Sequence, residues 1–372
     1  MSKGEQSMSE PLMITLRTLT PLWTGGVAGK SERLHVTGII GSLRWWYEAI
    51  VRGLGGEACD PVSDNKCRYD SQDPRPPEEQ LCPACYVFGA TGWRRRFRLK
   101  VVEDDTEPAW NPSIEALNIR PPDRSRGWYL PPGWVGRMTL RFAGDDETLQ
   151  QLAALFLFLE QWGTLGAKPQ LGYGAFEITN REEVVDRARD WTRRSQGDAV
   201  SLASLPDLRR FHFFRYTFTP ARRDWWLRLV DIQPLLGKHK EVSVLNTLYQ
   251  RRMVPTTPLL KNIWRYREWH GSRPVSRWIF GVSTVRKQAG RTVIHRVRSK
   301  IAVTWAYVLD DERWSMHGWL WLPERDDRER LPNDELERLV KIVLRRETFT
   351  TLCGAVREET YQIKHGMEVL HD

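Results

Sequence analysis

The sequence lacks any apolar run long enough to cross a membrane. Its longest apolar run, Leu152 to Leu159, is far shorter than the ~20 residues that a transmembrane helix needs. Residues 1–10 also lack the basic region and the apolar region of a secretory signal peptide. We therefore expect a protein that has no membrane contact and that works in the cytoplasm.

Motifs of common enzyme classes are missing as well. The sequence has no P-loop and no glycine-rich dinucleotide fingerprint, which excludes the usual nucleotide-hydrolysing and dinucleotide-binding enzymes. One of the eight histidines, His35, precedes the first expected helix, where a general acid for RNA cleavage could act. No base, nucleophile or carboxylate cluster accompanies His35, and a lone histidine beside glycines more often has a structural role. We therefore expect no catalytic residues.

Cysteine is sparse, with five residues, but four of them fall in one short stretch. Cys82 and Cys85 form a C-x-x-C pair, and Cys59 and Cys67 precede it. In a reducing compartment such a cluster indicates metal binding rather than disulfides. Four thiolates suit a closed tetrahedral Zn2+ site, which would be structural because no coordination position is left for water. The alternative is a set of free thiols in a flexible loop.

The charge of the chain is strongly one-sided. Lys and Arg outnumber Asp and Glu, which gives a net charge of +9 over 372 residues. Excess positive charge favours a polyanionic partner, because basic side chains that neutralise phosphates release bound counterions. There are also 18 tryptophans, most of which should lie in the core, while a few could stack on unpaired bases. Since basic and aromatic residues are interleaved, we expect the partner to be a nucleic acid.

One candidate contact surface is the start of the first expected helix. From Gly41 the pattern becomes helical, and Ser42 is the expected N-cap. Gly38, Gly41 and Ser42 could present free backbone N–H groups to a phosphate, with Arg44 adding a two-pronged donor. Ordinary capping and close packing explain the same residues equally well.

A second candidate is the arginine-rich segment 93–100. If it is a strand, Arg94, Arg96, Arg98 and Lys100 share one face, while Trp93, Arg95, Phe97 and Leu99 share the other. An all-basic strand face is costly unless it is solvated or paired with phosphate. A solvated face is the usual explanation, but the density of arginines here favours RNA contact.

A third candidate is the glycine-rich loop 163–174. Gly172, Tyr173 and Gly174 partly match the sheet motif of RNA-recognition domains, and Lys168 lies in the same loop. The glycines would let RNA approach the backbone closely. In the second half, basic residues recur among aromatics from Tyr249 to Lys300, which predicts either a second basic groove or a solvated surface.

The order of the expected elements indicates an α+β fold. A strand at 13–19, a helix from 41, a strand or hairpin at 86–89 and 93–102, a strand at 134–142, a helix at 149–162 and a strand at 175–179 match a βαββαβ ferredoxin-like unit. Residues 195–207 are small and polar and read as a linker. A second domain would then begin near Phe211, with a late hairpin formed by 301–307 and 314–322 and a last helix at 334–346.

These segments together resemble the RAMP superfamily of CRISPR-associated proteins, and within it the first subunits of type III-B (Cmr) effector complexes. The resemblance spans nearly the whole chain. It is carried by Thr20-Pro21-Leu22-Trp23-Thr24-Gly25-Gly26, by residues 37–46, by Phe88-Gly89-Ala90-Thr91-Gly92-Trp93 with the arginines after it, by Gly172-Tyr173-Gly174, and by Ser299-Lys300-Ile301 with 314–323.

The resemblance implies two ferredoxin-like, RRM-like RAMP domains: residues 11–195, with a zinc-binding, cysteine-rich insertion at 57–86, and residues 208–372. It implies a non-catalytic subunit that contacts the 3' region of the guide RNA, the target RNA and other subunits of the complex in antiviral defence. The residues carried over as RNA contacts are Gly38, Gly41, Ser42, Arg44, Trp45, Arg94, Arg95, Arg96, Arg98, Lys168, Gly172, Tyr173 and Gly174.

Two other functions remain open at this stage. A sister branch of RAMP proteins processes precursor guide RNA, so the chain could be a metal-independent endoribonuclease that uses His35. It could also be a zinc-stabilised structural subunit that contacts proteins more than RNA.

Overall fold

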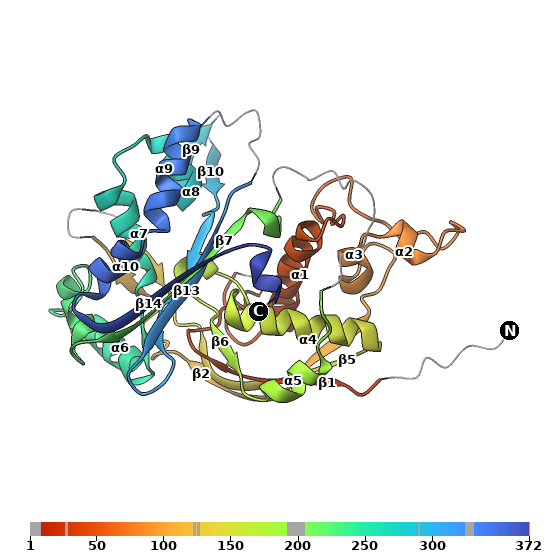
Figure 1. Ribbon diagram of the computed structural model, residues 1–372, viewed down its shortest axis with the longest axis horizontal. Helices are drawn as coiled ribbons and strands as arrows, with labels where there is room; N and C mark the ends of the chain where they lie inside the picture. Colours follow the sequence, from red (N-terminus) through yellow and green to blue (C-terminus); the bar gives the residue numbers. More distant parts are fainter. Residues whose placement is uncertain are drawn as a thin grey trace.

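The structure is a computed structural model that describes residues 9–26, 29–121, 124, 127–191, 205–288, 291–323 and 331–371. Two antiparallel sheets dominate it, each with helices packed on it (Figure 1). No helix in this described part is both long and apolar enough to span a bilayer.

The first sheet has the strand order β2-β5-β1-β6, and every neighbouring pair is antiparallel. Its strands are β1 (Leu12–Thr18), β2 (Phe97–Pro108), β5 (Trp134–Gly144) and β6 (Phe176–Ile178). The helices α1 (Val36–Gly53) and α4 (Asp146–Gln161) lie on one face of it, above the strands in Figure 1. In chain order the main elements of this sheet and its helices run β1-α1-β2-β5-α4-β6.

Alternating burial explains why these strands face the helices. In β1, Leu12, Ile14 and Leu16 are buried while the residues between them are partly exposed, so one face packs on the helices. The helix α4 begins where Asp145 accepts a hydrogen bond from the Thr148 backbone N–H at 3.0 Å. The expected α+β class with antiparallel sheets is therefore confirmed.

The strand expected at 86–89 is wrong, because residues up to Phe88 belong to the helix α3 (Pro83–Phe88). Two boundaries near the candidate RNA contacts also differ from expectation. The helix α1 begins at Val36 rather than Gly41, so Ser42 lies inside it and is not its N-cap. The strand β2 begins at Phe97 rather than Trp93, because Gly89 and Gly92 hold the preceding residues in a tight turn with positive φ. Both shifts matter below, since they relocate residues that were expected to bind RNA.

The second sheet has the order β14-β7-β13-β12-β8, with β11 also paired to β13. Its strands are β7 (Phe211–Pro220), β8 (Met253–Val254), β11 (Ile301–Val303), β12 (Ala306–Val308), β13 (Trp314–Trp321) and β14 (Val356–His365). The expected late hairpin corresponds to β11 and β12 against β13. Both β11 and β12 pair antiparallel with β13.

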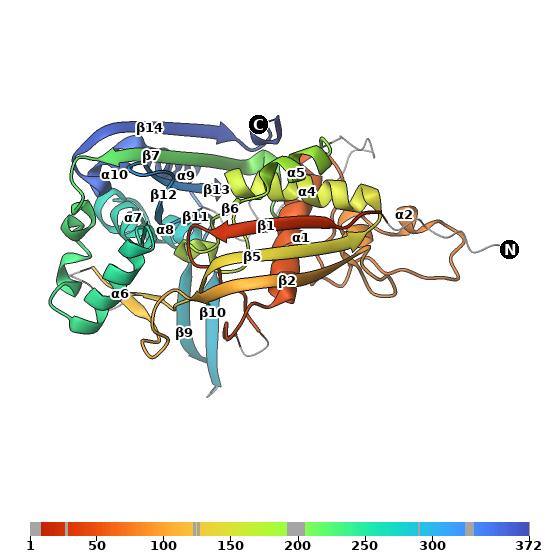
Figure 2. The same ribbon diagram turned by 90° about the horizontal axis from the view of Figure 1, so that it is seen from below.

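Helices connect the strands of the second half. They are α6 (His239–Gln250), α7 (Thr257–Asn262), the π-helix η5 (Ile263–Glu268), α8 (Arg273–Phe280), α9 (Asn333–Val343) and α10 (Arg346–Cys353). The expected last helix at 334–346 corresponds to α9. Strands β9 (Val282–Gln288) and β10 (Arg291–Val297) form a hairpin that projects from the body (Figure 2).

The smaller elements lie in the connections. They are α2 (Pro77–Gln80), α3 (Pro83–Phe88), β3 (Leu117–Ile119), β4 (Trp128–Leu130), η1 (Pro169–Leu171), α5 (Arg181–Arg187), η2 (Leu208–Arg210), η3 (Trp225–Arg228), η4 (Gln233–Leu235) and η6 (Glu368–His371).

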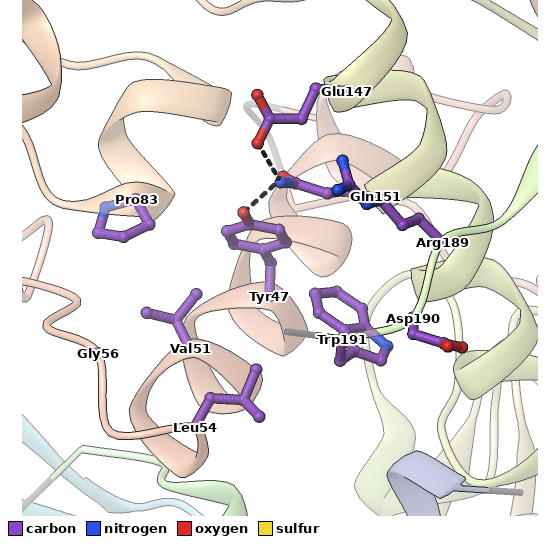
Figure 3. Close-up of a pocket in the computed structure, with 10 residues that line it drawn as sticks. All are labelled: Tyr47, Val51, Leu54, Gly56, Pro83, Glu147, Gln151, Arg189, Asp190 and Trp191. Carbon is purple, nitrogen blue, oxygen red and sulfur yellow. Dashed lines mark hydrogen bonds between the residues drawn. The ribbon is translucent and has the colours of Figure 1, made fainter. Parts of the chain in front are cut away.

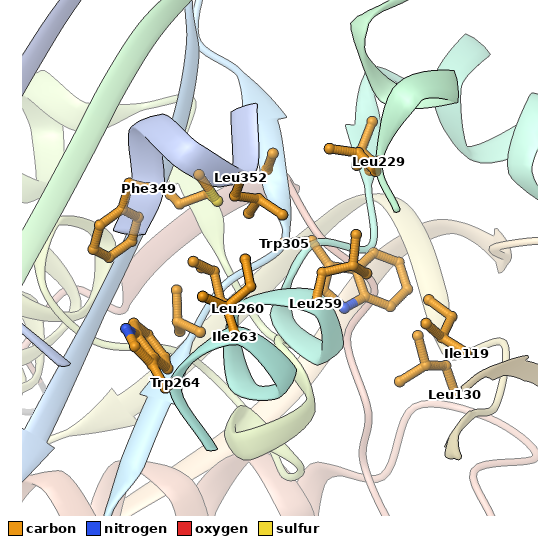
Figure 4. Packing of buried hydrophobic residues seen from close by; sticks show 14 of the residues in the cluster. Ile119, Leu130, Leu229, Leu259, Leu260, Ile263, Trp264, Trp305, Phe349 and Leu352 are labelled. Carbon is orange, nitrogen blue, oxygen red and sulfur yellow. The ribbon is translucent and has the colours of Figure 1, made fainter. Parts of the chain in front are cut away.

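The buried apolar residues form two clusters, and each draws on both halves of the chain. In one, Trp46 of α1 packs against Trp319 of β13 with ring centroids 4.8 Å apart. In the other, Ile119 and Leu130 lie beside Leu259 of α7 (Figure 4). The two halves are thus joined by shared cores. The expected linker falls mostly on 192–204, outside the described residues, and the domain division stays a prediction.

A buried histidine helps to join the halves. The His317 side chain is 1% exposed, and its Nε2 lies 2.9 Å from the Gly163 carbonyl oxygen. Its Nδ1 lies 2.8 Å from the Tyr307 hydroxyl. Because a carbonyl only accepts, Nε2 carries the proton and Nδ1 accepts from Tyr307. Burial lowers the pKa of His317 to about 3, so the ring is neutral in the folded protein.

This histidine should make stability fall in acid. Between the unfolded pKa of 6.5 and the folded pKa of about 3, the unfolded chain binds a proton that the folded chain does not. The free energy of unfolding should therefore drop by about 1.4 kcal/mol per pH unit more steeply in the native protein than in His317→Gln between about pH 6 and pH 4. Urea unfolding at a series of pH values measures both slopes. Parallel slopes would contradict the assignment.

Candidate metal centre and nucleic-acid interface

The four clustered cysteines converge on one point. The Sγ atoms of Cys59, Cys67, Cys82 and Cys85 all lie within 4.8 Å of one another. The Sγ of Cys59 is 3.4 Å from that of Cys85 and 3.9 Å from that of Cys82. These separations are too long for a disulfide, which needs about 2.05 Å. They suit a tetrahedron of thiolates around an ion with bonds of about 2.3 Å, whose sulfurs would lie about 3.8 Å apart.

The chemistry of this donor set calls for a cation. Hydrogen bonds from Cys67, Cys82 and Cys85 hold the pKa of the Cys59 thiol well below its usual value. The same contacts, first of all with Cys59, raise the pKa values of Cys82 and Cys85 above theirs. Four thiolates cannot therefore coexist here unless a positive ion balances their charge. The four cysteines thus fit a closed, four-sulfur metal site.

One face of α1 holds the cysteine loop. Arg44 donates from Nη2 to the Cys85 Sγ at 3.2 Å and from Nη1 to the Gly89 carbonyl oxygen at 2.9 Å. Its Nε donates to Glu48 at 2.7 Å. Arg52 lies one helical turn beyond Glu48. It donates to the carbonyl oxygen of Ala58 at 3.0 Å and to that of Cys59 at 3.3 Å.

Arg44 therefore makes its hydrogen bonds inside the protein. Burial raises the pKa of Glu48, and the hydrogen bond from Arg44 acts against that rise. This places Arg44 in an internal ion pair rather than on a free surface. The structure argues against its expected role as a phosphate ligand.

The start of α1 also differs from the expected anion site. Gly41 and Ser42 lie inside the helix, past the first turn whose N–H groups are free, so they do not form a phosphate cradle. A Cβ at Gly38 would lie 3.1 Å from the Thr24 Cβ, which shows that close packing explains this glycine. Trp45 is half-buried and contacts Trp46 edge-on at 4.8 Å.

His35 stands just before this helix. Its backbone N–H donates to the Thr24 hydroxyl at 2.8 Å, while its ring makes no hydrogen bond with a described residue. The ring packs against Gly26, where a Cβ would approach within 2.9 Å. This environment fixes the chain conformation and supplies no partner for acid–base chemistry.

The arginine-rich segment divides into a turn and a strand. Arg94 and Arg95 are exposed in the turn, and Arg95 lies over the Phe97 ring at 5.8 Å. Arg96 is instead bound to Asp145 at 2.9 Å and stacks on Tyr86 at 4.6 Å. The expectation of a single basic face from Arg94 to Lys100 is therefore wrong for Arg96. Its guanidinium is bound to Asp145, the N-cap residue of α4.

The cysteine loop supports this turn directly. The Trp93 indole N–H donates to the Tyr86 carbonyl oxygen at 2.9 Å, and the two rings stack at 5.6 Å. The Arg96 backbone N–H donates to the Val87 carbonyl oxygen at 3.0 Å. A Cβ at Gly92 would lie 2.4 Å from the Tyr69 carbonyl oxygen, so only glycine fits there. The position of Arg94 thus depends on the loop that the cysteines close.

The turn and the strand border a groove of about 1260 Å³. Arg98 and Lys100 are exposed on the sheet face turned away from the helices, and Lys100 lies directly opposite Arg141 of β5. Like charges opposite each other on a sheet repel. The acidic residue of the lining, Asp145, is already bound to Arg96. The groove therefore has positive charge without a matching carboxylate and is shaped for an extended polyanion.

Arg141 was missed from the sequence. Its neighbours in β5, Leu140 and Phe142, are apolar, so it gives no local signal of a basic cluster. Only the strand register brings it beside Lys100. The expected order of strands, combined with alternation in β5, is the signal that could have found it.

The glycine-rich loop lies between the two halves rather than on the surface. Gly172, Tyr173 and Gly174 are buried, and a Cβ at Gly172 would lie 2.2 Å from both Thr257 and Trp305. The prediction that these residues contact RNA therefore conflicts with the structure, because the second half of the chain covers them.

Lys168 of the same loop is half-buried. Its Nζ lies 3.6 Å from the centroid of the Trp23 ring, and burial lowers its pKa to about 8. Its expected role as an RNA contact stays a prediction.

Several basic residues of the second half already have partners. Arg251 pairs with Glu107 at 2.8 Å, and Arg267 pairs with Asp231 at 2.9 Å. Lys261 is fully buried, where its Nζ donates to the Gln170 and Ile301 carbonyl oxygens. These three residues of the expected second groove are therefore internal or neutralised.

A separate pocket lies between α1, α4 and the chain near Trp191 (Figure 3). The Tyr47 hydroxyl donates to Gln151 at 2.7 Å within it. Its volume of about 140 Å³ is below the ~300 Å³ of typical small-molecule sites, so it is too small for a nucleotide.

The role of Arg44 can be measured against that of Arg94. Arg44→Met removes the donors that serve Glu48, Cys85 and Gly89 and should lower the free energy of unfolding by about 1–3 kcal/mol. Arg94→Met makes the same chemical change at an exposed site and should shift it by less than about 0.5 kcal/mol. Urea unfolding of both variants checks this. Equal stability of the two variants would show that the α1 contacts contribute nothing.

Comparison with known proteins supports a family assignment for the part of the chain that holds the cysteine cluster and the groove. Residues 15–177 match the family model of the RAMP superfamily. Among solved structures, the chain is similar to Cmr1 from Pyrococcus furiosus (apo form), at 14% identity and a TM-score of 0.43, over 95% of this chain and 98% of that chain. It is similar to a chain of a structure titled Type IV-B CRISPR Complex, at 14% identity and a TM-score of 0.33, over 52% of this chain and 99% of that chain. No curated protein matches it in sequence. By this match, residues 15–177 of the chain are similar to the RAMP superfamily.

Proposed function

We propose that the protein is a non-catalytic, RNA-binding subunit of a type III-B CRISPR ribonucleoprotein and that its groove holds guide RNA or target RNA. The observation that carries the proposal is the unmatched positive charge of the groove: Arg94, Arg98, Lys100 and Arg141 line it without free carboxylates. The similarity of residues 15–177 to the RAMP superfamily and the sequence resemblance to type III-B first subunits support the CRISPR context. In this proposal each sheet belongs to one ferredoxin-like RAMP domain.

The groove favours contact with the RNA backbone over reading of bases. Guanidinium and ammonium groups on a strand face and a neighbouring turn form an extended row of donors, which suits successive phosphates. The aromatic ring of Trp93, which borders the groove, already packs against the rings of Tyr69 and Tyr86. Binding should therefore depend strongly on salt and weakly on sequence.

The absence of catalysis is part of the proposal. The surroundings of His35 support it, because the ring packs on Gly26 and makes no hydrogen bond with a described residue. A positioned general acid or base contributes on the order of 10²–10⁴-fold in rate. Incubation with precursor guide RNA tests this. Cleavage that His35→Ala slows by that factor would establish the endoribonuclease alternative instead.

A structural Zn2+ ion completes the proposal. Zinc would be held by the four thiolates and would supply no chemistry beyond fixing the loop, since no coordination position is left open. Protein purified without chelator should contain about one zinc per chain by elemental analysis. Cys82→Ser should lower that content and expose residues 57–96 to proteolysis while the thermal unfolding of the rest is retained. Zinc-free native protein with an ordered loop would refute it.

The groove is testable by charge removal. Arg94→Ala/Arg98→Ala/Lys100→Ala should weaken binding of single-stranded RNA and make the log–log salt slope shallower by about 2, since each phosphate contributes about 0.7. The matched control is Arg222→Ala/Arg313→Ala/Arg357→Ala, which removes three exposed arginines that are each paired with a carboxylate. Fluorescence anisotropy at several salt concentrations measures both. An equal loss in the control would refute the groove as the RNA site.

A further inference from the structure

A chain of charged groups runs from α1 to the cysteine cluster. The Glu48 carboxylate accepts from the Arg44 Nε at 2.7 Å, and the Arg44 Nη2 donates to the Cys85 Sγ at 3.2 Å. Glu48 and Cys85 are 6% and 2% exposed, so both ends of this chain are buried. The guanidinium is thus held by a carboxylate on one side while its other edge meets a sulfur of the candidate metal site.

Three contacts together fix the orientation of this guanidinium. Besides the bonds to Glu48 and Cys85, its Nη1 donates to the Gly89 carbonyl oxygen at 2.9 Å. Because the guanidinium is a planar, rigid fork, three acceptors in three directions leave it one orientation. Gly89 has a φ of 94°, and a Cβ there would lie 3.1 Å from the Arg95 backbone nitrogen, so this acceptor is itself held in a tight turn. The donor therefore points at the sulfur without rearrangement.

The second arginine that α1 directs at the cysteine loop shows a different kind of contact. Arg52 donates to the carbonyl oxygens of Ala58, Cys59 and Pro206 at 3.0, 3.3 and 2.8 Å. These bonds hold the backbone of the loop and of the entry to the second half. Packing of the loop is thus achieved through carbonyl oxygens, and a donor aimed at a sulfur calls for another explanation.

The charge of a four-thiolate site supplies that explanation. Four thiolates around a divalent ion leave two negative charges in excess, and the buried Cys85 cannot share its charge with water. The Cys67 Sγ accepts from the Cys82 backbone N–H at 3.4 Å, which is a neutral donor. A guanidinium donor is charged, and charge-assisted hydrogen bonds are about twice as strong as neutral ones. Arg44 therefore favours the thiolate form of Cys85 more than a backbone donor would.

We propose that Arg44 is a positioning residue of the metal centre: held by Glu48, it orients the Cys85 thiolate and offsets part of the negative charge of the four sulfurs. Carboxylate–histidine–zinc chains follow the same principle, because a carboxylate behind the ligand fixes its orientation. Here the guanidinium stands between the carboxylate and the sulfur. The proposal rests on the proposed zinc site and assigns a residue that sets how tightly the ion is held.

The experiment measures metal binding by two matched variants of the full-length protein. Arg44→Met removes the donor to sulfur and should weaken Zn2+ binding about 10–100-fold in competition with a chelator of known affinity. With Co2+ as the probe, the sulfur-to-cobalt charge-transfer band should move to longer wavelength, because the Cys85 sulfur loses the hydrogen bond that stabilises its electrons. Arg52→Met removes donors to carbonyl oxygens rather than to sulfur and should leave the position of that band unchanged.

The outcomes separate this role from the metal site itself. If the native protein binds neither ion, the proposed zinc site and the positioning role fail together. If the native protein binds zinc but Arg44→Met keeps both its affinity and its cobalt band, the positioning role is refuted and the zinc site stands. An equal loss of affinity in Arg44→Met and Arg52→Met, with neither band moved, also refutes the role, because loop packing would then explain the loss.

A measurement on the native protein covers the case in which Arg44→Met does not fold. In protein loaded with Cd2+ in place of zinc, a hydrogen bond to a ligand sulfur transmits scalar coupling between the metal and the donor proton. NMR should show this coupling from cadmium to a guanidinium proton of Arg44. The coupling to the Cys82 amide proton, which donates to the Cys67 Sγ, is the positive control. Absence of the Arg44 coupling would overturn the assignment.

Discussion

A carboxylate held between two arginines on α1 organises the candidate site. Glu48 is 6% exposed, accepts a hydrogen bond from Arg44 at 2.7 Å and lies 3.7 Å from Arg52. Burying such charges costs desolvation energy, so the arrangement persists only if the remaining donors are also satisfied. Here they are satisfied outside the helix, by the cysteine loop and by the Pro206 carbonyl oxygen at the entry to the second half. The ion pair therefore joins the cysteine loop and the entry to the second half to one helix.

The opposite face of the same helix explains why these regions stay in register. Leu43, Trp46 and Ile50 pack between the first sheet and residues of the second sheet. The polar face of the helix donates hydrogen bonds to the cysteine loop. The turn that carries Arg94 is built on that loop, and Arg98 and Lys100 are built on the sheet. The groove is thus a junction between the loop that holds the four clustered cysteines and a strand face, and its two walls are stabilised by different means: contacts around the cysteine cluster on one side, apolar burial on the other.

The parts of this structure that follow local rules could be predicted from the sequence. The cysteine spacing predicted the four-sulfur cluster, and apolar periodicity predicted the antiparallel α+β class. Tertiary context decided the rest. Gly172 and Gly174 look like surface loop glycines, but both have positive φ and serve tight packing, Gly172 against Trp305 and Gly174 against the Leu165 backbone. Arg44 looks like a phosphate ligand, but its partners come from residues 41 to 45 positions away. No local pattern carries such information.

Net charge alone also says little about where a polyanion binds, and the distribution of ion pairs says more. Arg251, Arg267 and Arg96 each have a carboxylate partner, so their charge is compensated close by. The groove instead holds Lys100 opposite Arg141, and these like charges repel each other in the free protein. A row of phosphates would relieve that repulsion and add attraction, so the groove gains more from a polyanion than an equal number of paired arginines would. The position of the unpaired cations, more than their total number, therefore decides where a polyanion would bind.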